Sequence, residues 1–462
     1  MKKKHLLILL FFTFLSTITI IFTNKVDAGD SWFHIANIKD LAFISKTRSY
    51  YGYGVGIFYP PLAHFLGSII YFILKPLGAV WAYKIEEILI LFLSGLSMYY
   101  VLDKTNKKIK LTGSILYITM PYHLNTIIVR GALAEQLTFI FVPIILLSIY
   151  YLINKKYKLF FNHFIFGFTF MIYSHLVMSV YTAIFVLILL LVNFKKLTKE
   201  SFKNLLLSSL FIVLFTLPFT LPLIDNLKEG IYVINTDGVM LKENIENYSL
   251  RLYDYFNYGI ETQILYIDII VLIFFIKSLK RKNKFYEMTL IFAILPFIMT
   301  LNIFPWEIMP NSLKMIQFPF RLLIFVNIPI IIGASLEMNK KWIYVIIFTT
   351  LLTLLNSDLT TYNFNKEDVL GWQKEYLPKN ALNNFKPDTS EYLYYKGYTL
   401  YDENNNKVKY EMSDNGFIKP ETKFTKIKYN GYNFTYIFMC FGIILLFFYN
   451  FFQKRLEKSY DI

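Results

Sequence analysis

Long apolar runs recur along nearly the whole chain, and short polar segments separate them. A helix needs roughly 20 apolar residues to cross a bilayer squarely, so the ends of the shorter runs must extend into the interface. We find no internal repeat and no pair of matching broken helices, which argues against an inverted-repeat transporter. The pattern predicts an all-α polytopic membrane protein with about twelve crossings, near residues 5–23, 86–102, 111–129, 136–153, 160–176, 177–194, 205–223, 263–277, 286–304, 320–337, 342–357 and 436–452.

Basic residues gather in the short segments between these runs. Seven clusters hold 24 Lys or Arg residues and four acidic residues, which accounts for the net charge of +15 without a nucleic-acid partner. Short loops rich in Lys and Arg remain on the cytoplasmic side of a membrane. The clusters lie at residues 2–4, 103–110, 154–158, 195–203, 277–284, 340–341 and 454–462.

The apolar stretch 61–80 decides the predicted orientation. If it crosses the membrane, the basic loop 103–110 and every later basic loop fall outside. If it stays on the outer side, all seven clusters and both termini are cytoplasmic. Pro60-Pro61 at its start and Pro76-Leu77-Gly78 at its end suit a short helix between two breaks. We therefore expect an interfacial or re-entrant helix here.

Composition agrees with a membrane location. Hydrophobic residues make up 55% of the 462 residues, more apolar surface than a soluble domain can bury, and mean hydropathy is +0.44. The single cysteine, Cys440, excludes an internal disulfide and a Cys-based zinc cluster. The run 5–23 could also be a signal peptide cleaved near Val26-Asp27-Ala28. It is longer than the usual apolar region of about 7–15 residues, which favours a first span.

The sequence divides into three parts by this reasoning. Residues 1–357 form the helical bundle with its outer loops, and residues 436–462 form the last span and a cytoplasmic tail. Residues 358–435 are an outer segment with eleven acidic and eleven basic residues. Alternating apolar and polar positions near Tyr392 and Lys407, with turn residues between them, predict a small β-rich appendage.

The predicted topology brings several polar side chains to the outer face. Asp30 and His34 follow the first span and lie four residues apart, on one side of a short helix. The other candidates lie in the outer loops or at the outer ends of spans, and they are Tyr59, His123, Arg130, Glu135, His175 and Arg321.

This set fits the transfer of a sugar from a lipid phosphate. The phosphate that is left behind is anionic, and the fork of Arg130 or Arg321 could bind its oxygens. The acceptor hydroxyl must lose a proton, for which Asp30 is the candidate base. His34, His123 and His175 could orient the substrate or donate to the phosphate. No cofactor is required, and the lack of a second acid beside Asp30 favours a metal-free site while leaving a divalent metal open.

Structural interpretations of the same residues stay open from the sequence alone. Polar side chains near the ends of spans often serve only as interface anchors. Arg130 and Glu135 could simply form an ion pair, and His175 could bond a neighbouring backbone carbonyl. Asp268 is interpreted as a buried, hydrogen-bonded acid within its span, although acids inside membranes are costly.

The order of these motifs resembles the bacterial YfhO-like membrane proteins and the membrane proteins labelled "6-pyruvoyl-tetrahydropterin synthase-related". Both groups resemble the GT-C glycosyltransferase superfamily. No histidine cluster has the spacing of a pterin-synthase zinc site, so the label implies no pterin chemistry. The resemblance rests on Gly29–His34, Phe58–Leu62, Pro121–His123, Val129–Glu135, Tyr173–His175 and Gln317–Arg321.

The resemblance implies a GT-C-like bundle in a bacterial cytoplasmic membrane, with an acidic catalytic residue in the first outer loop. Asp30 corresponds to that acid. Many such enzymes have a second acid in this loop, whereas here the nearest acids are Asp27 and Asp40. The implied donor is a polyprenyl-phosphate sugar, and the implied acceptor is an envelope polymer or lipid on the extracytoplasmic side.

Three other functions remain open from the sequence. A flippase for a lipid-linked glycan needs a continuous polar path, and few charges lie inside the predicted spans. A membrane acyltransferase needs a histidine deep in the bundle, for which His123 or His175 would serve. A non-catalytic partner of an envelope enzyme would dock through residues 358–435.

Overall fold

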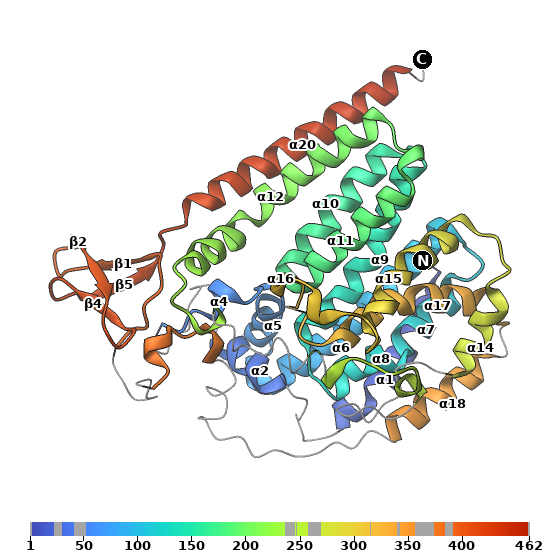
Figure 1. The fold of residues 1–462 in the computed structure, drawn as a ribbon, viewed down its shortest axis with the longest axis horizontal. Coiled ribbons are helices and arrows are strands. Elements are labelled where there is room, and N and C mark those ends of the chain that lie inside the picture. The colour runs from blue at the N-terminus through green and yellow to red at the C-terminus, as the bar shows by residue number, and fades with distance from the viewer. Residues whose placement is uncertain are drawn as a thin grey trace. The chain divides into compact units, whose positions relative to one another are not determined.

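The computed structural model describes residues 2–22, 30–40, 52–235, 245, 247–256, 269–314, 316–339, 342–355, 374–383 and 391–460. The chain forms two compact units, drawn together in Figure 1. The first unit contains residues 1–39, 62–198 and 240–364, and the second contains 40–61, 199–239 and 365–462. Asp268 and parts of the predicted appendage lie outside the described residues.

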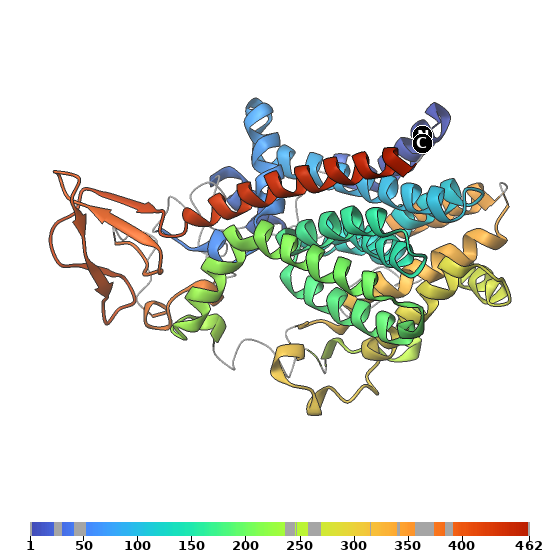
Figure 2. The same ribbon diagram turned by 90° about the horizontal axis from the view of Figure 1, so that it is seen from above.

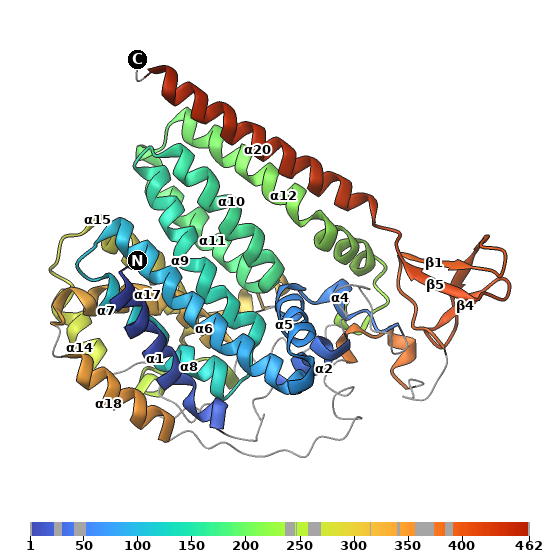
Figure 3. The same ribbon diagram turned by 180° about the vertical axis from the view of Figure 1, so that it is seen from behind.

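The first unit is a bundle of helices. Helix α6 packs against α7 and α9, α14 and α15 pack against α17, and α9, α10 and α11 lie side by side (Figures 1 and 3). The helices are α1 (Lys3–Phe22), α2 (Ser31–Asp40), α5 (Leu62–Ile73), α6 (Gly78–Thr105), α7 (Lys110–Thr119), α8 (Pro121–Ile128), α9 (Leu133–Ile153), α10 (Tyr157–Ser174), α11 (Leu176–Val192), α14 (Ile269–Ser278), α15 (Lys284–Thr300), α16 (Asn311–Lys314), α17 (Leu323–Glu337) and α18 (Trp342–Leu355), with 3-10 turns η1 (Lys75–Leu77), η2 (Phe194–Lys196), η4 (Leu252–Phe256), η5 (Trp306–Ile308) and η6 (Pro319–Leu322).

Several helices are long and apolar enough to cross a membrane. Within the described residues there are five, at Lys3–Phe22, Lys75–Thr105, Leu133–Ile153, Lys199–Lys228 and Pro319–Glu337. Shorter apolar helices occupy other predicted spans, including α11 and α14. The mostly helical, membrane-protein prediction is confirmed at this level.

Local sequence explains where the helices begin. At α15 the side chain of Asn283 accepts hydrogen bonds from the backbone N–H groups of Phe285 and Tyr286, at 3.1 and 3.0 Å. Such an N-cap satisfies donors that the first turn leaves without partners. In α9 the acidic Glu135 lies in the first turn, where the positive end of the helix dipole favours it.

The stretch 61–80 contains a break near its end. Helix α5 is twelve residues long, shorter than a crossing requires, and η1 follows it. The next helix begins at Gly78, whose φ of +83° places it in the left-handed region. The break at Pro76-Leu77-Gly78 is therefore where the sequence predicts it.

One predicted span differs from the structure. The segment 111–129 forms two helices, α7 and α8, which meet at Met120 and Pro121. Pro121 has no N–H, and it pushes the preceding residue toward extended backbone, so Met120 adopts φ −61° and ψ 131°. The chain bends here instead of continuing as one helix.

The second unit pairs two long helices with a small β appendage. Helix α12 (Lys199–Lys228) lies along α20 (Phe434–Tyr460), and the strands precede the start of α20 (Figures 1 and 2). On α12, Phe202, Leu206, Leu210 and Val213 are exposed at helical spacing, as expected of a face that contacts lipid. The unit also contains α4 (Val55–Phe58), η3 (Val233–Asn235), η7 (Lys374–Tyr376) and η8 (Lys379–Ala381).

The appendage confirms the predicted β structure. Strands β1 (Tyr398–Tyr401), β2 (Lys407–Val408) and β5 (Lys426–Tyr429) form one antiparallel sheet in the order β2-β1-β5, and β3 (Tyr410–Met412) pairs with β4 (Ile418–Pro420). Asp402 accepts the N–H groups of Asn404 and Asn406, both at 2.8 Å, and closes the predicted turn. Near Tyr392 only an isolated bridge at Leu393 forms.

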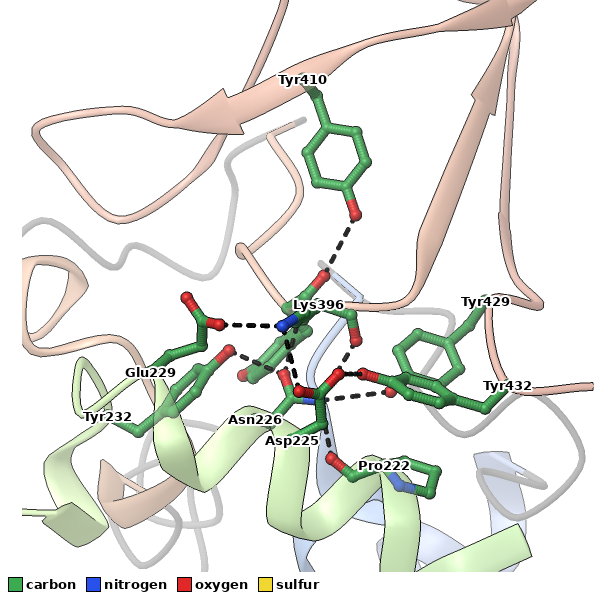
Figure 4. Close-up of polar contacts among 10 residues, drawn as sticks. Pro222, Asp225, Asn226, Glu229, Tyr232, Lys396, Tyr410, Tyr429 and Tyr432 are labelled. Atoms are coloured by element: carbon green, nitrogen blue, oxygen red, sulfur yellow. Dashed lines mark hydrogen bonds and ion pairs between the residues drawn. The ribbon is translucent and has the colours of Figure 1, made fainter. Parts of the chain in front are cut away.

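A polar cluster joins the appendage to the end of α12 within this unit (Figure 4). The buried side chain of Asn226 accepts from the N–H of Lys396 at 2.9 Å and donates to its carbonyl at 3.1 Å. The Lys396 ammonium lies between Asp225 and Glu229, at 3.0 and 3.1 Å. Tyr232 donates to Asn226 at 2.8 Å.

Candidate functional site

Three polar side chains converge on one buried carboxylate, that of Glu135. Its exposed fraction is 2%, and Nη1 of Arg130 lies 2.9 Å from its Oε2. Arg321 Nε donates to the same oxygen at 3.2 Å. The Tyr122 hydroxyl donates to Oε1 at 2.5 Å. These four residues, here the Glu135 cluster, come from α8, the turn before α9, α9 itself and η6.

Aromatic rings and carbonyl groups surround the two arginines. Arg321 lies 4.7 Å from the ring centre of Phe318, and Arg130 lies 5.0 Å from that of Phe320. Nη1 of Arg321 also donates to the carbonyl of Ile316 at 3.1 Å. Stacking on aromatic faces fixes a guanidinium plane and leaves its edge for hydrogen bonds.

A tight turn, residues 129–132, presents Arg130 to the cluster. The N–H groups of Val129 and Arg130 both donate to the carbonyl of Asn125 at 3.1 Å, and the N–H of Ala132 donates to that of Thr126 at 2.9 Å. Gly131 has φ +56°, a conformation that glycine adopts without strain. The turn therefore depends on the Arg130-Gly131 order in the sequence.

Asp30 is bound directly to this turn. Its backbone N–H donates to the carbonyl of Arg130 at 2.9 Å, which joins segments that lie a hundred residues apart. Burial raises the pKa of the Asp30 carboxyl, while Arg130 and Arg321 oppose that rise and Glu135 adds to it. The structure thus brings Asp30, Arg130, Glu135 and Arg321 into one electrostatic group.

Arg130 remains charged in this environment. Burial lowers the pKa of its guanidinium, but Glu135, Tyr122 and Asp30 together outweigh that effect, so the pKa is raised. A buried cation with two carboxylates nearby keeps its proton and can attract a further anion only in competition with them.

His34 pairs with another histidine in the same unit. Its Nδ1 lies 3.0 Å from Nε2 of His64, so one ring donates and the other accepts. Burial lowers the pKa of His34 to about 3, which keeps the ring neutral at ordinary pH. His34 lies one helical turn after Asp30, and the backbone N–H of His34 donates to the backbone carbonyl of Asp30 at 3.2 Å.

The remaining predicted site residues lie in different settings. His175 Nδ1 caps α11 by accepting the N–H of Met178 at 3.3 Å, and this ring interacts electrostatically with Glu135. His123 bonds the carbonyl of Tyr117 at 2.9 Å and stacks on Phe139, so it belongs to the packing of α7, α8 and α9. Tyr59 follows α4 in the second unit, where its backbone N–H donates to the carbonyl of Val55 at 2.8 Å.

Two adjacent acids on α6, Glu86 and Glu87, were not among the predicted site residues. Each is only 1% exposed. Oε1 of Glu87 accepts from the Tyr83 hydroxyl at 2.6 Å and from Nε2 of Gln136 at 3.2 Å. Glu86 packs against Gly67, where an added Cβ would lie 2.3 Å from Oε2. Two acids at the start of an apolar run are costly in a membrane, and that cost was the available signal.

A protein-family model matches residues 57–364, about two thirds of the chain, and is described as "6-pyruvoyl-tetrahydropterin synthase related domain; membrane protein". The chain belongs to this family of membrane proteins. The YfhO-like resemblance found in the sequence is thereby confirmed. The 6-pyruvoyl-tetrahydropterin synthase related domain contains the whole Glu135 cluster, whereas Asp30 and His34 precede its matched range.

A similar protein from Lactococcus lactis subsp. cremoris (strain MG1363), described as an uncharacterized protein, is 26% identical over 340 residues. The match covers 65% of this chain and 54% of the relative, so the chain spans about half the length of that protein. Among the residues that the structure describes, no group of three His, Cys, Asp or Glu side chains is arranged to hold a metal ion.

Proposed function

We propose that this family member is a membrane glycosyltransferase that moves a sugar from a polyprenyl-phosphate donor to an envelope polymer or lipid acceptor. One observation carries the proposal most directly. The backbone of Asp30 is hydrogen-bonded to that of Arg130, and both arginines act on the Asp30 carboxyl. A base and two phosphate-binding cations close together are what transfer from a phosphate-linked sugar requires.

The arginines would bind the phosphate of the donor. Arg130 and Arg321 share the single carboxylate of Glu135, and each guanidinium has five N–H donors. Nη1 of Arg321 also donates to Ile316 and Gln317, and we propose that the remaining donors of the two guanidinium groups reach phosphate oxygens. As the bond between the sugar and the phosphate breaks, the electron pair stays on the phosphate oxygen, where these cations stabilise it.

Asp30 would act as the general base. The acceptor hydroxyl oxygen forms a bond to the anomeric carbon of the sugar while its proton passes to the Asp30 carboxylate. Because burial raises the pKa of Asp30, its ionised form is a stronger base than an exposed aspartate. Direct attack on the side opposite the phosphate inverts the configuration at the anomeric carbon.

We further propose a GT-C-like bundle of about twelve crossings in a bacterial cytoplasmic membrane, with both termini in the cytoplasm. The positive-inside pattern of the seven basic clusters supports this orientation. In it, α2, α5, the 129–132 turn and η6 lie on the extracytoplasmic side, where a lipid-linked donor is presented. Envelope polymer or lipid acceptors would approach from the same side.

The deciding experiment is an Asp30→Asn substitution with insertion and protein level monitored. Transfer of sugar from a polyprenyl-phosphate donor by the purified full-length variant should fall by about 100-fold or more, because a positioned base contributes at least that much. The matched control is Asp40→Asn, at the far end of the same helix α2, which should keep wild-type activity. Unchanged transfer in Asp30→Asn would refute the assignment of the base.

A further inference from the structure

The 129–132 turn is also held from the side of α6. The Tyr83 hydroxyl donates to Glu87 at 2.6 Å and lies 3.4 Å from the carbonyl of Gly131. Gly131 directly follows Arg130, so a contact at this carbonyl bears on the position of the guanidinium. Tyr83 therefore connects Glu87 on α6 with the turn that carries Arg130.

Gln136 makes a second connection from Glu87 to the same turn. Its Nε2 donates to Glu87 at 3.2 Å and to the carbonyl of Thr126 at 3.0 Å. The Thr126 carbonyl also accepts the N–H of Ala132, which closes the turn. Gln136 is fully buried and follows Glu135 in the first turn of α9.

We propose that Glu87 is a positioning residue that holds Tyr83 and Gln136 against the 129–132 turn and so fixes Arg130 at the donor phosphate. The inference rests on the proposed function, because the phosphate role of Arg130 belongs to it. Glu87 accepts hydrogen bonds from Tyr83 and Gln136. Its influence passes through the two hydrogen-bond donors it accepts.

The chemistry of residue 87 separates positioning from simple burial. Leucine at this position has similar volume but no acceptor, so the buried donors of Tyr83 and Gln136 lose their shared partner. Glutamine keeps an oxygen acceptor in the same place and should rescue the arrangement. Glu86 offers a matched control, because it is an equally buried acid that directly precedes Glu87 in the same helix.

The test measures steady-state transfer by purified full-length Glu87→Leu, Glu87→Gln, Tyr83→Phe and Glu86→Gln proteins with a polyprenyl-phosphate sugar. Glu87→Leu should raise the KM for this donor by about tenfold, the equivalent of one strong hydrogen bond, with little change in kcat. Glu87→Gln and Glu86→Gln should stay close to wild type. The double variant Tyr83→Phe/Glu87→Leu should be no worse than Glu87→Leu, because both remove the same link.

Hydrogen exchange of the backbone amides in residues 129–133 gives a readout that needs no activity. Glu87→Leu and Tyr83→Phe should both speed exchange there, and Glu86→Gln should not. Additive effects on KM, or unchanged exchange in Glu87→Leu, would overturn the positioning role while the transferase stands. A wild-type protein without any transfer would instead remove the proposed function, and the exchange result would then report only on the turn.

Discussion

Glu135 explains why two arginines can lie together in a largely apolar bundle. A lone guanidinium is expensive to bury, and two of them repel each other. With Oε2 shared between Arg130 and Arg321 and Oε1 bonded to Tyr122, each charge has a partner at hydrogen-bond distance. The ion pair between Arg130 and Glu135, left open as a structural interpretation of the sequence, is present, and the proposed phosphate site uses the same guanidinium.

The charge balance at this group leads to a pH prediction. Arg130 holds the pKa of Asp30 below the value that burial alone would give, so Arg130→Gln should raise it further. In the proposed mechanism the ionised carboxylate is the base, so activity should fall as pH drops through that pKa. The acidic limb of the normalised kcat/KM profile should therefore move to higher pH in Arg130→Gln.

The matched control for this prediction is Arg281→Gln. Arg281 forms an ion pair with Glu337 in the first unit but does not act on Asp30. The acidic limb of the kcat/KM profile of Arg281→Gln should coincide with that of the wild type. A limb that stays in place in Arg130→Gln would show that Asp30 is not the group that titrates.

At the residue scale, sequence reasoning predicted which charged groups meet but not all of the partners they use. Chain position and the positive-inside pattern predicted Asp30, Arg130 and Arg321 on one face, and in the structure both arginines affect the pKa of Asp30. The partner of Arg321 could not be predicted, because Glu135 lies 186 positions away. Glu87 was missed because it lies at the predicted start of a span, where a charged residue is ordinary. Its hydrogen bonds to Tyr83 and Gln136 are visible only in the structure.

At the scale of elements, α2, α5 and α6 approach one another closely at Gly67. A Cβ on Gly67 would lie 2.5 Å from the Cδ1 of Ile38 and 2.3 Å from Oε2 of Glu86. The His34–His64 pair lies one turn earlier on α2 and α5. Close packing at Gly67 thus keeps the helix that follows Asp30 against its neighbours.

The predicted consequence is that Gly67→Ala destabilises the first unit by about 1–3 kcal/mol, the usual effect of overpacking. Phe72→Ala on the same helix is the control, since Phe72 is 78% exposed and its loss should change stability by less than about 0.5 kcal/mol. Thermal unfolding of both variants in detergent measures the difference. Equal midpoints for the two variants would contradict the close packing described here.

Apolar runs predicted which segments are helical, and the break at Pro76-Leu77-Gly78 was predicted too, whereas the break at Met120 was not. The runs near 136–153 and 205–223 correspond to α9 and α12 within a few residues. The run 111–129 instead bends at Met120, whose backbone is extended before Pro121. A proline alone does not decide such a break, because α9 continues through Pro143 and α12 continues through Pro218 and Pro222.

At the scale of the whole molecule, the chain forms two compact units, each built from three separate segments. The first unit contains the candidate site, and the second contains α12, α20 and the β appendage. The predicted boundaries at 357 and 435 followed composition along the chain. They could not show that α12 packs with α20, because pairing between distant helices depends on which faces complement each other.

The cluster in Figure 4 predicts how the appendage is held to α12. Asn226→Ala removes the partner of both backbone groups of Lys396 and should lower stability by about 1–3 kcal/mol. Lys396→Met keeps those bonds and removes partly exposed ion pairs, so it should lower stability by only about 0–1 kcal/mol.

Limited proteolysis of the full-length protein measures this difference, because cleavage within residues 391–433 reports release of the appendage. Asn226→Ala should be cut faster than Lys396→Met under the same conditions. The reverse order would mean that the charges, not the buried amide, hold this segment.

The charges of Asp30, Arg130, Glu135 and Arg321 together affect the binding of any anionic ligand. Two guanidinium groups and two carboxylates sum to zero when all are ionised. A lipid phosphate that enters these surroundings adds negative charge, and the four groups carry no net positive charge to offset it. If a proton enters with the donor to offset that charge, occupancy should decline as the medium becomes more alkaline, and donor-binding measurements at several pH values would show it.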